Sequence, residues 1–148
     1  MKIDETDRKI ISLLQEDARQ SNAAIARDIG VSEATIRRRI RMLVEDGTLA
    51  IRAVPNPNKF GLNTSALIGI DVQPDQLEDT AKSLEDREEV QYLAVSTGRY
   101  DLICFVLVHT LEDLRTFLES YLSKVPGIRK TETLVVLDVK KRGSGRIG

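Results

Sequence analysis

Four arginines lie close together between residues 34 and 44, a stretch with no acidic residue to neutralise them. They are Arg37, Arg38, Arg39 and Arg41. On a helix that turns about 100° per residue, Arg38 and Arg41 point away from the apolar side, whereas Arg37 and Arg39 lie at its margins. Guanidinium groups bind phosphates and guanine edges, so this segment could place a positive face in a DNA groove.

The start of the same segment is small and polar. Ser32 is expected to cap the helix, and Ala34 and Thr35 lie on its outward side, where small residues permit a close approach to a major groove. A run of charges on a helix is usually only a solvated face, so the surrounding elements must decide. The predicted DNA-contact set is Ser32, Ala34, Thr35, Arg37, Arg38, Arg39 and Arg41.

Those surroundings predict three helices in the first fifty residues. Asp4 can cap the first, and Ser21 or Asn22 can cap the second, which Gly30 ends. The third helix follows Ser32, so a short helix, a tight turn and a longer capped helix follow one another, as in a helix-turn-helix. Residues 48–54 are rich in β-formers and predict a wing or a short arm strand. The first domain is therefore predicted as a winged helix-turn-helix over residues 1–54.

Two prolines in the sequence Pro55-Asn56-Pro57-Asn58 predict a linker at 55–63. The second domain is predicted at 64–140, and residues 141–148 form a flexible basic tail that is expected to be solvated rather than to touch DNA. Within the second domain we predict strands at 65–72, 90–96, 101–109 and 131–139, and helices at 74–85 and 111–123. This βαββαβ order is that of a ferredoxin-like domain of the α+β class.

The strand at 101–109 is apolar on both faces. The two helices can cover only one side of the sheet, so the other side would be an exposed apolar patch, which soluble monomers avoid. Sheet-to-sheet packing in a symmetric homodimer is the simplest way to cover it. The alternative is that the first domain or its arm covers that face.

Composition and single residues limit the other functions. The net charge is −1, and the longest apolar run has seven residues, at 102–108, far short of a membrane span. No secretory signal is visible, so we expect a cytoplasmic protein with no membrane partner. Cys104 is the only cysteine and His109 the only histidine. We therefore predict no metal site, cofactor or catalytic set, with Cys104 in the core and His109 at a strand end.

The ordered motifs resemble the Lrp/AsnC family of feast/famine regulators over nearly the whole length. The resemblance rests on Asp4, Asp7, Ile10, Leu13, Leu14, Asp17, Arg19, Ile25-Ala26, Ile29-Gly30, Ser32, Arg39-Ile40, Leu43, Gly47, Pro57, Gly61-Leu62, Thr97 to Asp101, Val125-Pro126-Gly127, Thr131 and Thr133. Val44, where an acid is common, and the arm after Gly47 depart from the pattern. The resemblance implies a sequence-specific DNA-binding regulator that forms dimers and often octamers.

The resemblance also implies an amino acid as effector, bound between dimers. Its pocket would lie near Gly98, Arg99, Tyr100 and Asp101, with Thr131 and Thr133 opposite. Asp101 could bind the ammonium group, and loop N–H groups and threonine hydroxyls could bind the carboxylate. Alternatively, Gly98 serves only the hairpin turn, Asp101 caps it, and the threonines are ordinary strand residues.

Two competing functions are carried forward. Proteins of similar architecture act as sirohaem decarboxylases, but these need histidine and arginine over a tetrapyrrole, and this chain has one histidine. The other alternative is an effector-binding module that does not bind DNA. The arginine-rich helix argues against that alternative.

Overall fold

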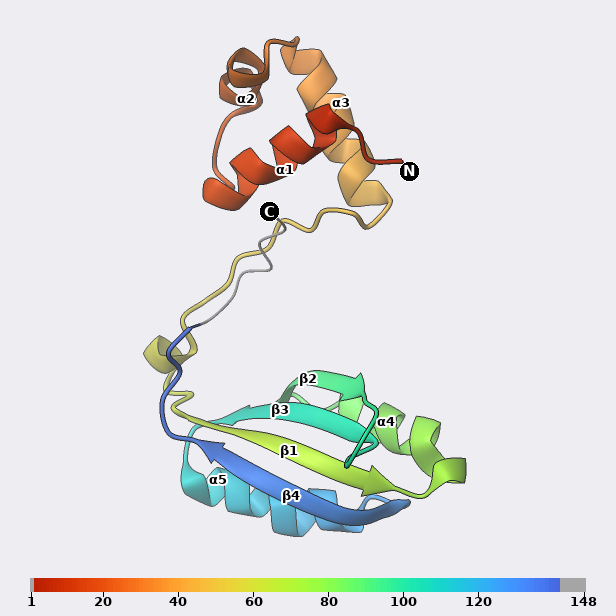
Figure 1. Cartoon of the computed structure of the whole chain (residues 1–148). Coiled ribbons are helices and arrows are strands. Elements are labelled where there is room, and N and C mark those ends of the chain that lie inside the picture. Colours follow the sequence, from red (N-terminus) through yellow and green to blue (C-terminus); the bar gives the residue numbers. More distant parts are fainter. Residues whose placement is uncertain (1, 142–148) are drawn as a thin grey trace. The chain divides into compact units, whose positions relative to one another are not determined.

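A computed structural model describes residues 2–141 of the chain (Figure 1). The chain divides into two compact units between Val54 and Pro55, and the second unit extends to Lys140. Each unit has a hydrophobic core of its own, so each is described separately.

The first unit consists of α1 (Glu5–Glu16), α2 (Asn22–Ile29) and α3 (Glu33–Glu45). The expected caps are present, because the side chains of Asp4, Ser21 and Ser32 each accept a hydrogen bond from a backbone N–H in the first turn of their helix. Gly30 ends α2 in the left-handed conformation, with φ of 81°. The predicted helix-turn-helix is confirmed. Its buried core residues are Ile10, Leu14, Ile25, Ala26, Ile36 and Leu43.

The predicted wing or arm strand is not formed in this single chain. Residues 49–56 have neither helical nor strand structure. A strand needs a neighbour to pair its backbone groups, and the described part of the first unit contains only helices. Residues 48–54 therefore have no strand to pair with among the described residues of the unit. The linker that follows contains a short 3₁₀ helix, η1 (Pro57–Phe60), which Gly61 ends.

The second unit is a four-stranded antiparallel sheet with helices, which confirms the predicted α+β class. Its strands are β1 (Thr64–Val72), β2 (Val90–Val95), β3 (Leu102–Val108) and β4 (Ile128–Val136), in the order β2-β3-β1-β4. The helical segments are η2 (Pro74–Gln76), α4 (Leu77–Glu85), α5 (Leu111–Thr116), the π-helix η3 (Phe117–Tyr121) and the 3₁₀ helix η4 (Leu122–Lys124).

Two predicted elements, the last strand and the last helix, differ from the structure by several residues. The last strand begins at Ile128 rather than residue 131, because the turn at Gly127, with φ of 90°, brings the chain directly into register with Val72. It ends at Val136, which pairs with Ser65 near the start of β1. The single helix expected at 111–123 is α-helical only to Thr116, and its second half is the π-helix followed by a 3₁₀ turn.

The helices α4 and α5 cover the same side of the sheet (Figure 1). Ile68, Ile70 and Cys104 of the sheet pack with Leu84 of α4 and Phe117 of η3, and all five side chains are buried. Burial in this apolar core raises the pKa of the Cys104 thiol to about 11. Cys104 is therefore a core residue, as predicted. The opposite side of the sheet, called the open face below, is not covered by any described helix of the second unit.

Candidate DNA-binding and effector sites

The start of α3 is held in place by its own polar residues. The hydroxyl of Ser32 accepts a hydrogen bond from the backbone N–H of Thr35 at 3.2 Å, and the two hydroxyls lie 2.8 Å apart. Ser32 and Ala34 are exposed, and Thr35 is partly exposed. This part of the predicted DNA-contact set is therefore on the surface, with its hydroxyls fixed at the first turn of the helix.

Arg38 and Arg41 are exposed and form no ion pair with any described residue. Arg37 makes a surface ion pair with Glu33, at 2.7 Å, in which both side chains are about half exposed. Such i, i+4 pairs contribute little and are easily exchanged for another partner. These three arginines thus leave a cationic surface on α3.

Arg39 differs from the other three arginines. Its Nη1 donates to Asp4 Oδ2 at 2.7 Å and to Asp7 Oδ1 at 2.8 Å, and the side chain of Asp7 is only 3% exposed. Hydrogen bonds to Asp7 and Asp4 raise the pKa of Arg39, and the backbone N–H of Asp7 and the Arg39 side chain lower the pKa of Asp4. Arg39 therefore joins α3 to the start of α1 instead of presenting its charge to solvent.

The loop from Gly98 to Asp101 joins β2 to β3. Gly98 has φ of 105°, which an L-residue rarely adopts. Asp101 Oδ2 accepts a hydrogen bond from the backbone N–H of Val72 at 2.8 Å, and the Asp101 N–H donates to the Ile70 carbonyl at 3.0 Å. Asp101 thus holds the hairpin against the end of β1, which agrees with the alternative interpretation of Asp101 as a cap of the turn. Its Oδ1 forms no hydrogen bond with another described residue.

Tyr100 lies across the middle of β1 on the open face. A Cβ added to Gly69 would lie 2.5 Å from the Tyr100 ring, so only glycine leaves room there. The Tyr100 hydroxyl donates to Glu132, and Arg99 Nη2 lies 2.9 Å from Glu132 Oε2. The hydrogen bond to Glu132 raises the pKa of Tyr100.

Glu132 and Gly69 were missed by the sequence analysis. A glycine inside an apolar strand and an acid between two threonines were the available signals, but the β1–β4 register that pairs them could not be read from the chain.

Thr131 and Thr133 do not meet Tyr100 in a single chain. They pair with Ile70 and Ile68, whose side chains face the helices, whereas Glu132 pairs with Gly69 on the open face. Alternation along a strand therefore puts the two threonines on the side of the sheet away from Tyr100. The loop and the threonines could share a ligand only with a second copy of the chain.

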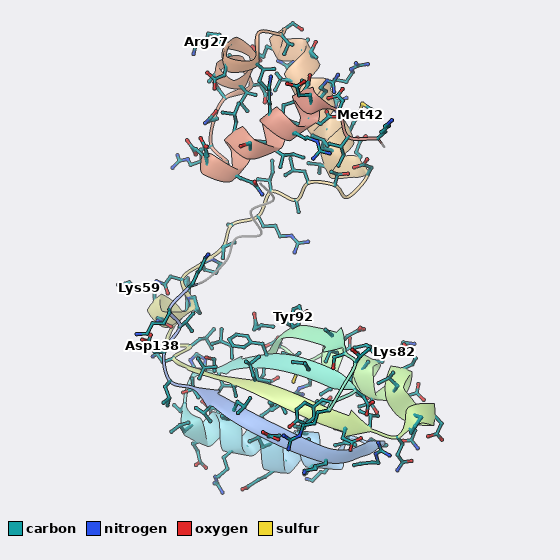
Figure 2. The ribbon with its side chains drawn as sticks, in the orientation of Figure 1. Arg27, Met42, Lys59, Lys82, Tyr92 and Asp138 are labelled. Atoms are coloured by element: carbon teal, nitrogen blue, oxygen red, sulfur yellow. The ribbon has the colours of Figure 1, made fainter. Side chains whose placement is uncertain are left out.

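The open face is largely apolar, as predicted. Leu67 is 41% exposed and Leu134 57%, and Tyr92, labelled in Figure 2, is 60% exposed. Ile103 and Phe105 lie between these residues and are partly exposed. At the end of β3, His109 is exposed and its Nδ1 lies 3.2 Å from the Gly61 carbonyl oxygen of the linker. His109 is thus a surface residue at a strand end.

The described residues contain neither a candidate membrane span nor a candidate metal site. No helix in this part of the chain is long and apolar enough to cross a membrane. No group of three or more histidine, cysteine, aspartate or glutamate side chains there could hold a metal ion.

Comparison with known proteins decides the family. The model of the AsnC-type helix-turn-helix domain matches residues 3–52, and that of the Lrp/AsnC ligand binding domain matches residues 65–145. The chain belongs to the Lrp/AsnC family. An HTH-type transcriptional regulator of Pyrococcus furiosus is 38% identical over 98% of this chain and 99% of its own. The regulator Ptr1 of Methanocaldococcus jannaschii is 32% identical, over 96% of this chain and 97% of its own.

Solved structures of the Lrp/AsnC family agree with this assignment. AsnC of E. coli has a TM-score of 0.90 and 27% identity, over 97% of this chain and 98% of its own. A regulator from Neisseria meningitidis, solved as a complex with L-Met, has the same fold, with a TM-score of 0.90 at 24% identity over 99% of this chain and 97% of its own. The chain is thus a DNA-binding transcriptional regulator of the Lrp/AsnC family, and the prediction that it is not an enzyme is confirmed by its relatives.

Proposed function

We propose that this Lrp/AsnC regulator binds its operator through the outward face of α3, with Arg38 and Arg41 as the principal contacts. The observation that supports this proposal is that both side chains are exposed and have no acidic partner among the described residues, whereas Arg39 is held by Asp4 and Asp7. Ser32, Ala34, Thr35 and Arg37 complete the contact surface. Because its target is double-stranded DNA, we place the protein in the cytoplasm.

We further propose that the open face is covered by a second copy of the chain. Leu67 and Leu134 are directly paired across β1 and β4, and Phe105 adjoins Leu67 on the other side. An apolar patch of this kind is expected to be buried, and a two-fold axis lets one patch cover its own copy. Assembly of such dimers into an octamer is the larger form that the family resemblance implies.

The effector that we propose is an amino acid, and the match to the Lrp/AsnC ligand binding domain supports a ligand in the second unit. Asp101 would bind the ammonium group through Oδ1 while Oδ2 keeps its bond to Val72, since a carboxylate accepts several hydrogen bonds. Gly98, Arg99 and Tyr100 form the loop wall. Thr131 and Thr133 would come from another copy, because within one chain they lie on the other side of the sheet.

The test of the proposed function begins with the full chain and random duplex DNA. Rounds of selection should enrich one sequence, and fluorescence anisotropy with that duplex should show tighter binding than with a scrambled duplex. Arg38→Ala and Arg41→Ala should each weaken binding to the selected duplex. Enrichment of no sequence, or equal affinity for both duplexes, would contradict the proposal of a sequence-specific regulator.

A further inference from the structure

The second unit contains a pocket that the proposed function does not use. Its volume is about 700 Å³, within the range of small-molecule sites. It is lined by the end of β3 at His109, by the start of β2, and by the π-helix η3. The proposed effector loop lies before Leu102, at the opposite end of β3, roughly 20 Å away at the rise of a strand. The pocket is therefore distinct from the effector loop.

One wall of this pocket is aromatic and fixed. Phe117 and Tyr121 are the two ends of the π-helix, and their ring centroids are 5.6 Å apart. The Tyr121 hydroxyl donates to the Ser83 carbonyl, and the Arg87 guanidinium lies 4.3 Å from the centre of the Tyr121 ring. A π-helix turn is rare and is frequently found at functional sites. Here it presents both rings to one cavity.

The charges around the pocket are unbalanced toward the negative. Arg87 is neutralised by Glu89, to which it makes two hydrogen bonds, at 2.7 and 3.1 Å. The carboxylates of Glu88 and Asp113 remain. The Glu88 carboxylate forms no hydrogen bond or ion pair with another described residue. Asp113 accepts two hydrogen bonds from Thr110 through Oδ2, which leaves Oδ1 open. Two carboxylates that line the same pocket as these aromatic side chains favour a cation.

We propose that this pocket is a second ligand site, which binds a small organic cation carrying a primary ammonium group. Glu88 and the open oxygen of Asp113 accept from the ammonium, and the Phe117–Tyr121 wall packs against the carbon chain. Ser120, which also lines the pocket, stands at its exposed side.

The pocket adjoins the end of the linker. Leu62 lines the pocket, and His109, another lining residue, is in hydrogen-bond range of the Gly61 carbonyl at 3.2 Å. A ligand in this pocket would therefore lie beside the residues at which the linker enters β1. The ligand can thereby stabilise one conformation of that junction.

The experiment uses isothermal titration calorimetry of the full chain with three molecules of one chain length: 1,4-diaminobutane, 1,4-butanediol and succinate. We expect diaminobutane to bind at concentrations up to about 10 mM, and the neutral and anionic molecules not to bind in that range. Glu88→Gln should weaken diaminobutane about three-fold to five-fold, the share of one exposed ion pair. Glu78→Gln, an exposed acid on α4 away from the pocket, is the matched control and should change nothing.

A second variant tests the cavity itself. Ser120→Trp places an indole at the pocket and should abolish the binding of diaminobutane while the thermal unfolding midpoint stays near that of the parent chain. Asp101→Asn should leave diaminobutane binding intact, which separates this site from the proposed effector loop. Equal binding of succinate or butanediol, unchanged affinity in both Glu88→Gln and Ser120→Trp, or no heat with diaminobutane would overturn the proposal.

Discussion

Arg39 Nη1 lies 2.8 Å from the Oδ1 of Asp7, a carboxylate only 3% exposed, and this pair joins α3 to α1. The same atom also contacts Asp4, whose side chain caps α1. One guanidinium thus satisfies two acids at the end of a helix. The pair gives Arg39 a part in positioning α3, while Arg38 and Arg41 on the outer face form no ion pair with any described residue.

Removal of that guanidinium should destabilise the first unit. Arg39→Ala would leave Asp7 buried without a cation, and breaking such a pair costs about 3 kcal/mol. We expect a lower denaturant midpoint for the helical signal of the first unit. Arg37→Ala, whose partner Glu33 is exposed, is the control and should change the midpoint little. Equal effects of the two substitutions would show that the buried pair does not stabilise the unit.

The same cluster predicts loss of stability in acid. The pKa of Asp4 is lowered in the folded chain, by the Asp7 backbone N–H and then by Arg39. A lowered pKa means that the contribution is complete above the unfolded value of 3.8 and is lost as the pH falls through the folded pKa. Urea unfolding between pH 6 and 3 should therefore show a loss concentrated at the acid end. Asp4→Asn should flatten that part of the profile.

Two outward arginines should carry DNA affinity. Arg38→Ala and Arg41→Ala should each weaken operator binding by about ten-fold, as loss of a charged contact does, with unchanged unfolding midpoints. Arg27, an exposed arginine at the end of α2 that Figure 2 labels, provides the control substitution Arg27→Ala. Anisotropy titrations measure all three. If Arg27→Ala weakened binding as much as the α3 variants, the contact surface would have to be redrawn.

Salt should oppose binding in a measurable way. Phosphate contacts release counterions, so the logarithm of the association constant should fall linearly with the logarithm of salt concentration. If Arg41 contacts a phosphate, Arg41→Ala should reduce the slope by about one, and an arginine that reads a base should change affinity for one base pair instead. A flat salt response of the parent chain would rule out phosphate-driven binding.

The local features of the fold could be predicted from the sequence, whereas contacts between residues distant in the sequence could not. Each of these local features depends on only a few neighbouring residues, and each is present in the structure. They are the caps at Asp4 and Ser32, the turn at Gly30, and the strand β3 with apolar residues on both faces. The Arg39–Asp7 pair joins positions 32 residues apart in the sequence. Helical periodicity placed Arg39 at the margin of the apolar side of its helix, but it could not identify Asp7 as the partner.

The proposed effector site also depends on contacts that the sequence could not predict. The loop from Gly98 to Asp101 could be marked from its residues, but the faces of Thr131 and Glu132 depend on the register between β1 and β4. The prediction of an arm strand at 48–54 was wrong for a related reason. Its composition favours a strand, but pairing requires a neighbouring strand, and the described residues of the first unit contain none.

The open face should control assembly. Leu134→Glu places a charge where β4 would meet a second sheet, so the chain should sediment as a smaller species than the parent in analytical ultracentrifugation. Leu111→Glu, at an exposed leucine that starts α5 on the helical side, is the matched control and should leave the mass unchanged. A parent chain that sediments as a monomer would refute the dimer directly.

Asp101 offers the sharpest test of the effector proposal, because two substitutions separate its two roles. Asp101→Asn removes the charge but keeps an oxygen that can accept from the Val72 N–H, so the fold should keep its unfolding midpoint. Asp101→Ala also loses that hydrogen bond, so the free energy of unfolding should fall by about 1 kcal/mol and the unfolding midpoint should be lower. In thermal-shift titrations with each of the twenty amino acids, the parent should respond to at least one, and both variants should lose the response. If Asp101→Asn kept the full response, the ammonium group would have to bind elsewhere, and Asp101 would serve only to fasten the hairpin to β1.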